Sequence, residues 1–579
     1  MWSARRQAGE PIAVIGAGCR LPGAHGPAQL WQHLVDGRDL ITEVPPDRFS
    51  VDDYVAPFPP PPGMTTSRWG GFVDGVAEFD AEFFGIDDDA AASLDPQQRL
   101  LLMTAWEALE DAGQLPEHLA GSRTAVFVGQ SQADYWDLQS TRPDRLGLLS
   151  ALGGQQRGMA AGRLSYTFDL RGPSVTVDAA QASSGAAVHL AAQSLRSGES
   201  TMAVVAGINL VLAPTPAVLF GQAGVLAADG RCKFGDRSAD GFVRSDGVVV
   251  VVLKPLSAAL ADGDRVRAVL LGSAVSNDGR AKPELTAPSV TGQAMAMRSA
   301  YATAGVSPGD VDYVEAHGTG TRIDAAELAA MTEVLAEGRP AGRPCLVGSV
   351  KTNLGHTEAA AALTGLVKAV LCLEHQLVPP SLHCTRPRAD VDWARVPLVV
   401  PEVATPLPDR GRPAIVAVNG QSMTGTNVHL VLAQASVVPD PGGAGTGRSS
   451  GVPEAGRDHY PLVLTARSPA GLTELIHSYL AFLAPDGAGA ALDLRDICYS
   501  TNVRRRRYPH RVVVRGSSHD DMIRELRAVL SGEPPETVLT PHDIGPSGRL
   551  VPLPLRPWQT TRHWLDWVGP PSPRTAVGT

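Results

Sequence analysis

Gln181 stands at a junction that would suit a catalytic nucleophile. The β-branched run from Val175 to Val177 predicts a strand, and the Ala-rich run from Ser183 to Arg196 predicts a helix. A side chain at the start of a helix faces free backbone N–H groups and the positive end of the helix dipole, which stabilise a thiolate or an oxyanion. Glutamine is not a nucleophile, but its amide donates and accepts hydrogen bonds. The sequence therefore indicates a site arranged for covalent catalysis from which the covalent step has been removed.

Two histidines lie in glycine-bearing turns that follow predicted strands. His317 opens the run His-Gly-Thr-Gly-Thr, and His356 belongs to Leu-Gly-His-Thr. Such turns let an imidazole project into a cleft while the neighbouring backbone comes close to a substrate. A neutral imidazole that carries its proton on Nε2 can donate a hydrogen bond to an oxygen that gains negative charge. One such histidine is more often structural, and it is the pair that points to a site.

Length and composition narrow the class of protein. A chain of 579 residues with 44% hydrophobic residues is too long for one ordinary domain and can bury a large core. A formal net charge of −10 argues against a nucleic-acid binder. The six cysteines form no Cys-x-x-Cys pair and no zinc spacing, so we expect reduced thiols in a cytoplasmic protein, and no metal site. No apolar run is long enough to predict a membrane span or a leader.

The elements that must position these residues alternate in type along the chain. Up to about residue 432, β-type runs alternate with helical patterns, which predicts an α/β body. A segment rich in Pro, Gly and Ser predicts a flexible linker, and a short α/β pattern follows it. We therefore expect two bodies, residues 1–434 and a smaller one that begins at residue 459, joined by the linker 435–458.

Six ordered motifs carry a family resemblance. From about Pro11 to Leu432 the chain resembles the ketosynthase domain of modular type I polyketide synthases. The matching strings are Ile12-Ala-Val-Ile-Gly-Ala-Gly-Cys-Arg-Leu-Pro-Gly23, Asp95-Pro-Gln-Gln-Arg-Leu-Leu-Leu102, Trp106-Glu-Ala-Leu-Glu-Asp-Ala-Gly113, Glu315-Ala-His-Gly-Thr-Gly-Thr321, Gly348-Ser-Val-Lys-Thr-Asn-Leu-Gly-His-Thr357 and Gly425-Thr-Asn-Val-His429.

This resemblance implies an architecture. It implies a thiolase-like α/β fold of two βαβαβαββ halves stacked as five layers, normally in a homodimer. Residues 459–536 are similar to the linker domain that follows such ketosynthases, and residues 537–579 to the tail that comes after an acyltransferase. About twenty residues, from Thr537 to Leu553, cannot hold an acyltransferase. We therefore expect loading by another polypeptide, such as a separate acyltransferase.

The resemblance also implies roles for individual residues. Gln181 occupies the place of the catalytic cysteine, His317 and His356 face the substrate thioester, and Lys351 orients and supports them electrostatically. Further substrate-binding and gate positions carried over from the family are Asn419, Gln421, Ser422, Thr319 and Thr321. The substrate would arrive on the phosphopantetheine of a separate acyl carrier protein, with no other cofactor and alongside other polyketide synthase subunits.

The chemistry implied is decarboxylation without condensation. Loss of CO₂ from a malonyl thioester leaves an enolate whose charge lies mainly on the thioester oxygen, and two imidazole donors stabilise it without any nucleophile. The family includes such a subtype, with glutamine for cysteine, and Gln181 would then leave the enolate to be protonated to an acetyl or propionyl thioester. Alternatives are a silent scaffold resembling a chain-length factor, a repurposed acyl-transfer enzyme, and a Gln181 that merely plugs the acyl channel.

Several positions depart from the family pattern or lack a role in it. The gate loop has the sequence Asn-Gly-Gln421-Ser422 where the family has Ser-Ser-Phe-Gly. The turn before Glu327 is one residue shorter than in the family, so the orientation of His317 is expected to differ. Arg504–Arg507 is interpreted as solvated charge or, second, as a contact for an acidic carrier. The acidic residues of one predicted helix are expected to be solvated; these are Glu107, Glu110 and Asp111.

Overall fold

The main body of the protein is an internally repeated α/β structure. A computed structural model describes residues 9–435, 459–533 and 548–568. Neighbouring strands of the first half run in the order β1 (Ile12–Leu21), β10 (Gly247–Pro255), β8 (Met202–Asn209), β6 (Thr124–Gln130) and β7 (Ser174–Val177). Those of the second half run in the order β11 (Ala268–Asn277), β18 (Thr426–Gln434), β17 (Ile415–Gln421), β12 (Tyr313–Glu315) and β13 (Cys345–Gly348). In both halves the first two pairings are antiparallel and the next two are parallel.

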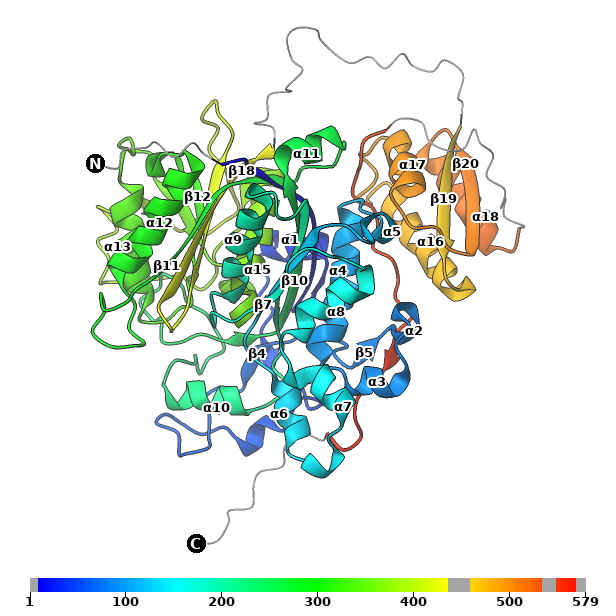
Figure 1. Ribbon diagram of the computed structural model, residues 1–579. Coiled ribbons are helices and arrows are strands. Elements are labelled where there is room, and N and C mark those ends of the chain that lie inside the picture. Colours follow the sequence, from blue (N-terminus) through cyan, green and yellow to red (C-terminus); the bar gives the residue numbers. More distant parts are fainter. Residues whose placement is uncertain (1–8, 436–458, 534–547, 569–579) are drawn as a thin grey trace.

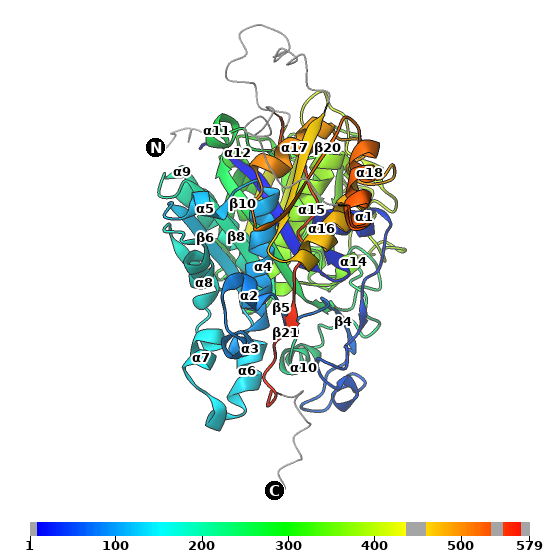
Figure 2. The ribbon, with the colours of Figure 1, turned by 90° about the vertical axis from the view of Figure 1, so that its right-hand side faces the viewer.

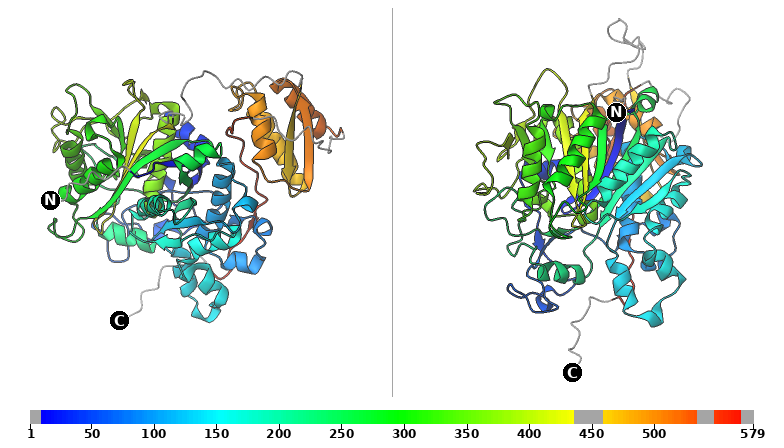
Figure 3. Two further views of the ribbon diagram at one scale, coloured as in Figure 1. Left: turned by 45° about the horizontal axis from the view of Figure 1, so that its top comes forward. Right: turned by 60° about the vertical axis from the view of Figure 1, so that its left-hand side comes forward.

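Helices complete a five-layered arrangement around these strands. Between the halves lie α9 (Ser183–Arg196) and α15 (Ala361–His375), which contact each other and strands of both halves (Figure 1). The outer faces are covered by α4 (Pro96–Asp111) and α8 (Met159–Phe168) on one side, and by α12 (Val290–Ala304) and α13 (Asp324–Leu335) on the other. Pairing of Ile12–Val14 with Ala268–Leu270 joins the halves into one continuous sheet, which Figure 3 shows from two further sides. The expected thiolase-like architecture is confirmed.

The residues of these layers explain why they pack so closely. In β10 the valines from 248 to 252 are fully buried, as expected of a strand covered on both faces. A Cβ on Gly16 would lie 2.5 Å from the Ala108 carbonyl oxygen of α4, and one on Gly18 would lie 2.7 Å from the Thr104 carbonyl oxygen. The glycines near the N-terminus therefore allow a helix to approach β1.

Shorter elements connect the layers. In the first half they are β2 (Ala24–His25), α1 (Pro27–Val35), β3 (Thr42–Glu43), η1 (Val51–Asp53), β4 (Trp69–Gly71), β5 (Glu78–Phe79), α2 (Ala81–Phe84), α3 (Asp88–Ser93), α5 (Pro116–Leu119), α6 (Asp134–Ser140), η2 (Pro143–Arg145), α7 (Leu148–Ser150), η3 (Ala151–Gln155), α10 (Thr215–Gln222), β9 (Arg244–Ser245) and α11 (Leu256–Ala261). In the second half they are η4 (Pro308–Asp310), α14 (Lys351–Leu354), η5 (Glu358–Ala360), β14 (Leu377–Val378), β15 (Leu398–Val399) and β16 (Thr405–Pro406).

A separate small α/β body follows the main one. Its strands β19 (Tyr460–Ala466) and β20 (His510–Gly516) pair antiparallel. Its helices are α16 (Pro469–Leu483), α17 (Leu494–Val503) and α18 (His519–Leu530), and side chains from all five elements share one core. From residue 436 on, the predicted linker 435–458 lies outside the described residues, so the exact segment boundaries remain predictions.

The tail at 548–568 runs from the small body back to the main one. The Val551 N–H donates to Ser500 Oγ of α17 at 3.0 Å, and Trp558 Nε1 donates to Glu107 Oε1 of α4 at 2.7 Å. The short strand β21 (Thr561–Arg562) then pairs with β5, as Figure 2 shows. The described part of the tail therefore fastens the small body to the first half of the main body.

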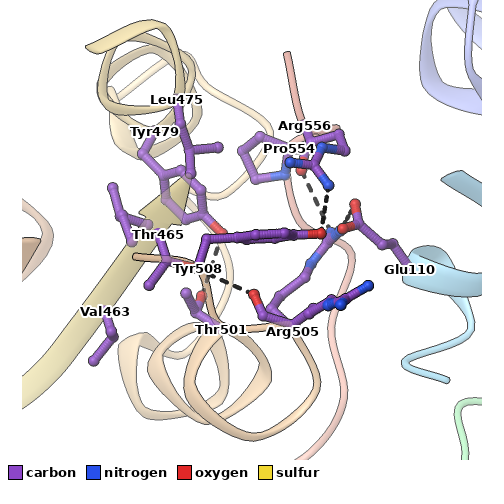
Figure 4. A pocket seen from close by; sticks show the side chains of 12 residues that line it. Glu110, Val463, Thr465, Leu475, Tyr479, Thr501, Arg505, Tyr508, Pro554 and Arg556 are labelled. Carbon is purple, nitrogen blue, oxygen red and sulfur yellow. Dashed lines mark hydrogen bonds and ion pairs between the residues drawn. The ribbon is translucent and has the colours of Figure 1, made fainter. Parts of the chain in front are cut away.

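An arginine-rich seam completes this junction. The Arg505 guanidinium bonds Glu110, and Arg556 Nη1 donates to the Tyr508 hydroxyl at 2.8 Å (Figure 4). The Arg556 guanidinium also lies 4.3 Å from the ring centre of Phe83, a cation–π distance. These arginines join parts of the chain, so the interpretation of residues 504–507 as a solvated run is wrong for Arg505.

The acidic residues of α4 are also not solvated, contrary to expectation. Glu107 is 3% exposed and bonds both Arg20 and Trp558. Asp111 accepts from Arg267 Nη1 at 2.8 Å and from the Ala17 N–H at 2.9 Å. Helical periodicity predicted a solvated face because it does not show that segments distant in the sequence cover this helix.

Candidate active site

The turn between β7 and α9 presents Gln181 at the N-terminus of a central helix. The Ser183 hydroxyl accepts from the Ala179 N–H at 2.9 Å and donates to the Ala180 carbonyl oxygen at 2.5 Å. These bonds hold Ala180 at a φ of 51°, a left-handed conformation that costs a residue with a Cβ roughly 1–2 kcal/mol. The strained turn places Gln181 two residues before the start of α9. The predicted nucleophile-type junction is present.

The Gln181 carboxamide contacts the gate loop through one residue that sequence reasoning missed. Its Oε1 accepts from the Met423 N–H at 3.3 Å, and its Nε2 lies 3.9 Å from the Met423 sulfur. A thioether is a weak acceptor, so the amide NH₂ group keeps donor capacity for another partner. Met423 follows the gate positions directly, which is the signal that could have identified it.

His317 is held in place by two buried carboxylates at the start of α13. Glu327 accepts the N–H groups of His317 and Gly318, each at 2.8 Å. Asp324 accepts the Thr319 N–H at 3.2 Å and the Gly320 N–H at 2.9 Å. The turn that is one residue short therefore still anchors the loop that carries His317. Its first four backbone N–H groups all have carboxylate partners.

Thr319 and Thr321 support this loop from within. Their hydroxyl oxygens lie 2.9 Å apart, and both contact Asp324 Oδ1, at 3.0 and 3.4 Å respectively. Both residues are buried. Both hydroxyl groups are therefore hydrogen-bonded to the Asp324 carboxylate.

His356 follows α14 and is fixed by the neighbouring segment 243–245. Its N–H donates to the Val243 carbonyl oxygen at 2.7 Å, and its carbonyl oxygen accepts from the Ser245 N–H at 2.9 Å. The ring contacts the Phe242 ring edge to face, with 5.3 Å between centroids. His356 and His317 also meet edge to face, at 5.2 Å and an interplanar angle of 81°.

Backbone hydrogen bonds determine where each imidazole carries its proton. His317 Nδ1 accepts from the Gln421 N–H at 3.3 Å, and His356 Nδ1 accepts from the Glu358 N–H at 3.0 Å. A neutral ring whose Nδ1 accepts must carry its proton on Nε2. No described residue forms a hydrogen bond with either Nε2 atom. The site therefore contains two neighbouring Nε2–H donors without protein acceptors among the described residues.

The electrostatic surroundings keep both rings neutral. Burial lowers the pKa of His317 and of His356 well below 6.5, and the positive charge of Lys351 lowers both further. Burial also lowers the pKa of Lys351 itself. Lys351 is 3% exposed, and its ammonium group has no ion-pair or hydrogen-bond partner among the described residues. A buried cation of this kind suits an anionic ligand.

A separate buried ion pair supports the Lys351 turn. Lys368 Nζ lies 2.9 Å from Glu315 Oε2, and both side chains are at most 1% exposed. Glu315 Oε1 accepts the Val350 N–H at 2.6 Å, one residue before Lys351. Lys368 thus neutralises the carboxylate that holds this turn.

We predict that Lys368→Met lowers the free energy of unfolding by about 3–5 kcal/mol, because Glu315 would remain buried without its partner. Chemical denaturation measures this loss. The matched control is Arg298→Ala, which breaks an exposed pair with Glu333 and Glu337 and should cost less than about 1 kcal/mol. Equal losses in the two variants would contradict the prediction.

The three gate positions have different environments. Asn419 Nδ2 donates to Glu327 Oε1 at 2.8 Å, and its Oδ1 lies 2.6 Å from His429 Nδ1, so its side chain is part of the buried support. Gln421 bonds His317 through its backbone N–H. Ser422 is 2.5 Å from Thr424 Oγ1 within an exposed turn. The segment 421–423 therefore connects His317 to Gln181, while Asn419 lies behind it.

The described residues contain neither a candidate metal site nor a candidate membrane-spanning helix. No group of three or more His, Cys, Asp or Glu side chains in the described ranges is arranged to hold a metal ion. Within the same ranges, no helix combines the length and the apolar character that crossing a membrane requires.

Comparison with protein families gives matches over most of the chain. Residues 9–259 match the N-terminal domain of β-ketoacyl synthases, and residues 267–385 match the C-terminal domain. Residues 460–526 match the CurL-like C-terminal family of polyketide synthases. The last match covers most of the small α/β body.

Individual relatives agree with these matches. A mycocerosic acid synthase-like polyketide synthase of Mycolicibacterium smegmatis is 41% identical, over 93% of this chain and 25% of its own length. A phenolphthiocerol/phthiocerol polyketide synthase polypeptide of Mycobacterium tuberculosis is 42% identical, over 94% of this chain and 28% of its own length. The chain thus spans about a quarter of the length of these curated relatives.

Solved structures resemble nearly the whole chain. The oxazolomycin ketosynthase domain of Streptomyces albus has a TM-score of 0.88 at 31% identity, covering 96% of this chain and 99% of that one. The ketosynthase of module 6 of the bacillaene synthase of Bacillus subtilis has a TM-score of 0.84 at 28% identity, covering 96% and 100%.

Proposed function

Because the chain belongs to the β-ketoacyl synthase family and carries a ketosynthase domain of a type I polyketide synthase, we propose that it decarboxylates a malonyl or methylmalonyl thioester without condensing it. The substrate would be carried on the phosphopantetheine of an acyl carrier protein. The products would be CO₂ and an acetyl or propionyl thioester. This activity would supply starter units for polyketide biosynthesis.

The observation that carries the proposal is the pair of Nε2–H donors on His317 and His356. When the C–C bond to the carboxylate breaks, its electron pair moves into an enolate and the thioester oxygen gains negative charge. Both donors would bind this oxygen, and neutral donors already in place lose little energy in reorganisation. A proton then adds to carbon to give the acyl thioester. Lys351 would favour the developing anion through its buried charge.

Gln181 would exclude the condensation reaction. No acyl group can be stored on a carboxamide, so the enolate has no electrophile attached to the protein. The Gln181 NH₂ group, whose partner in the protein is a thioether, would donate to the substrate or to a bound water.

The contact between Gln181 and Met423 also favours a second candidate function. Since Oε1 is bonded to the gate loop, the glutamine would close the acyl channel in a condensation-incompetent partner that resembles a chain-length factor. The two candidates differ in one result. Purified protein and malonyl-loaded carrier give CO₂ only if the chain is a decarboxylase.

The depressed pKa values predict an unusual pH dependence. Protonation of Nδ1 would break the backbone hydrogen bond that positions each ring, so we expect each ring to act in its neutral form. The charged form appears only below the pKa of the ring, which lies well below 6.5 in both cases. We therefore expect the rate of CO₂ release to stay constant as the pH falls through 6.5, and to be lost only at more acidic pH. A stopped assay over a pH series measures this. Burial raises the pKa of Glu327, which holds the His317 loop, to about 7, so a midpoint near 6.5 is checked by repeating the series with Glu327→Gln. A midpoint near 6.5 that persists in this variant would show that at least one ring has an ordinary pKa.

We also propose a homodimer formed through β7. This strand is an edge of the sheet, Val175 on it is 44% exposed, and Tyr166 of the adjacent α8 is 89% exposed. An exposed apolar edge strand is a ready surface for pairing with a second copy.

Val175→Arg is expected to convert the dimer to a monomer, because two arginines would face each other across the pairing axis. Light scattering after size-exclusion chromatography should show the mass falling from twice 60.7 kDa to 60.7 kDa. Val403→Arg, at a 70% exposed valine of the other half, is the control and should remain dimeric. A monomeric wild-type protein would refute the proposal.

A further inference from the structure

The residue that holds His356 Nδ1 has a strained backbone. Glu358 donates its N–H to this nitrogen from a φ of 43°, in the left-handed region that residues with a Cβ avoid. Such a conformation costs of order 1–3 kcal/mol and persists where surrounding contacts enforce it. Something must therefore hold Glu358 in this position.

A buried ion pair supplies that restraint. Glu358 Oε1 lies 2.6 Å from Arg244 Nε, and each side chain is 3% exposed. The backbone of Arg244 is adjacent to His356 as well, because residues 243 and 245 on either side bond the His356 N–H and carbonyl oxygen. The ion pair thus links the residue that fixes the ring nitrogen to the strand that fixes the ring's backbone.

The Arg244 guanidinium also has N–H donors without hydrogen-bond partners. Among the described residues, neither Arg244 Nη1 nor Nη2 has a hydrogen-bond partner, and Glu358 Oε2 and Asp134 Oδ1 are likewise buried without one. The charged or titratable groups that act on His356 are Lys351, His317 and Arg244, with Glu358 bonded to its ring through the backbone. Arg244 contributes to lowering the pKa of His356.

We propose that Arg244 and Glu358 are positioning residues for His356, which hold its proton on Nε2 and keep the ring uncharged. Glu358 would do so through its restrained N–H, and Arg244 through its restraint on Glu358 and through its positive charge. The inference deepens the proposed decarboxylase function, on which its rate measurements rest. Neither residue would touch the substrate.

The effect of the Arg244 charge on His356 is tested by measuring the rate of CO₂ release against pH in three variants. The acidic limb of the CO₂-release profile is the pH range over which the rate falls on acidification. Arg244→Met should move this limb to higher pH by up to about one pH unit, because the variant removes a positive charge that disfavours the imidazolium form of His356. Arg244→Lys keeps the positive charge, so the acidic limb of its profile should lie at the same pH as in the wild-type protein. Glu358→Gln removes the carboxylate that pairs with the Arg244 guanidinium, although Asp134 and Asp246 still act on it, and should leave the acidic limb unmoved or shift it to lower pH.

A matched control removes a buried arginine elsewhere. Arg267 pairs with Asp111 and Glu374 but is not among the groups that act on His356. Arg267→Met should lower the melting temperature without moving the limb. Equal shifts in Arg244→Met and Arg244→Lys, or a shift in Arg267→Met, would overturn the proposal.

A second measurement needs no activity. In protein with ¹⁵N-labelled histidine, NMR would give the tautomer of His356, assigned by its loss in His356→Gln. The wild-type ring should remain neutral with its proton on Nε2 as the pH falls through 6.5, and Arg244→Met should titrate at higher pH. A ring protonated on Nδ1 would refute the inference even if the protein releases CO₂. The expected tautomer without CO₂ release would instead refute the proposed function.

Discussion

His317→Ala and His356→Ala are each expected to slow CO₂ release from a malonyl-loaded carrier protein by roughly 100- to 1,000-fold, the usual effect of removing one oxyanion donor. Each variant removes one of the two Nε2–H donors and leaves the enolate oxygen with a single imidazole partner. The double variant should be slower than either single variant, because both Nε2–H donors that stabilise the enolate oxygen are then absent. Single-turnover assays with excess enzyme measure the chemical step directly.

The control for this result is another histidine of the same body. His189 lies on α9 and contacts Ser273 Oγ at 3.0 Å, outside the site. His189→Ala should leave the rate unchanged, and thermal melting should show all four proteins to be folded. Undiminished CO₂ release from the double variant would mean that the histidines are not the catalytic groups.

Gln181→Cys is expected to create a reactive thiol where the wild-type protein has none. A cysteine before the start of α9 would have its thiolate stabilised by free N–H groups and the helix dipole. Burial raises the pKa of the native thiols, to about 12 for Cys19, Cys232, Cys345, Cys372 and Cys498 and about 11 for Cys384. At neutral pH the new thiol should hold at least roughly a thousandfold more thiolate than any of them.

Intact-protein mass spectrometry after brief treatment with iodoacetamide measures this difference. The variant should gain one adduct, and it should also become acylated by an acyl-loaded carrier protein. The wild-type protein should gain neither within the same time. Ser422→Cys, in the exposed gate turn, controls for accessibility alone and should react more slowly. An unreactive Gln181→Cys would show that the junction does not activate a nucleophile.

Much of the fold was predictable because local signals agree with tertiary structure there. The helix predicted at Ser183–Arg196 has those bounds in the structure, since an Ala-rich run follows a β-branched strand and a turn. Strand β13 at Cys345–Gly348 was not predicted. It has four residues and gains its partners only through parallel pairing with distant strands. Helix α17 was missed as well, although Asp493 caps it by accepting the Arg495 N–H.

The site was predictable in its residues but not in its proton positions. Motifs indicated His317, His356 and Lys351, and the structure places the two imidazoles in contact. The partners of their Nδ1 atoms are the backbone N–H groups of Gln421 and Glu358, which no side-chain pattern reveals. The shortened turn suggested a displaced His317, but Asp324 and Glu327 accept all four N–H groups of residues 317–320.

In the proposed reaction, two neutral imidazoles promote the release of CO₂ from a carrier-bound malonyl group with no covalent intermediate on the protein. Mass spectrometry of malonyl-loaded carrier protein, incubated with the wild-type chain, tests it directly. We expect conversion of malonyl to acetyl on the carrier's phosphopantetheine, with the mass of this chain unchanged. A malonyl group that persists at the background rate, or an acyl adduct on this chain, would contradict it.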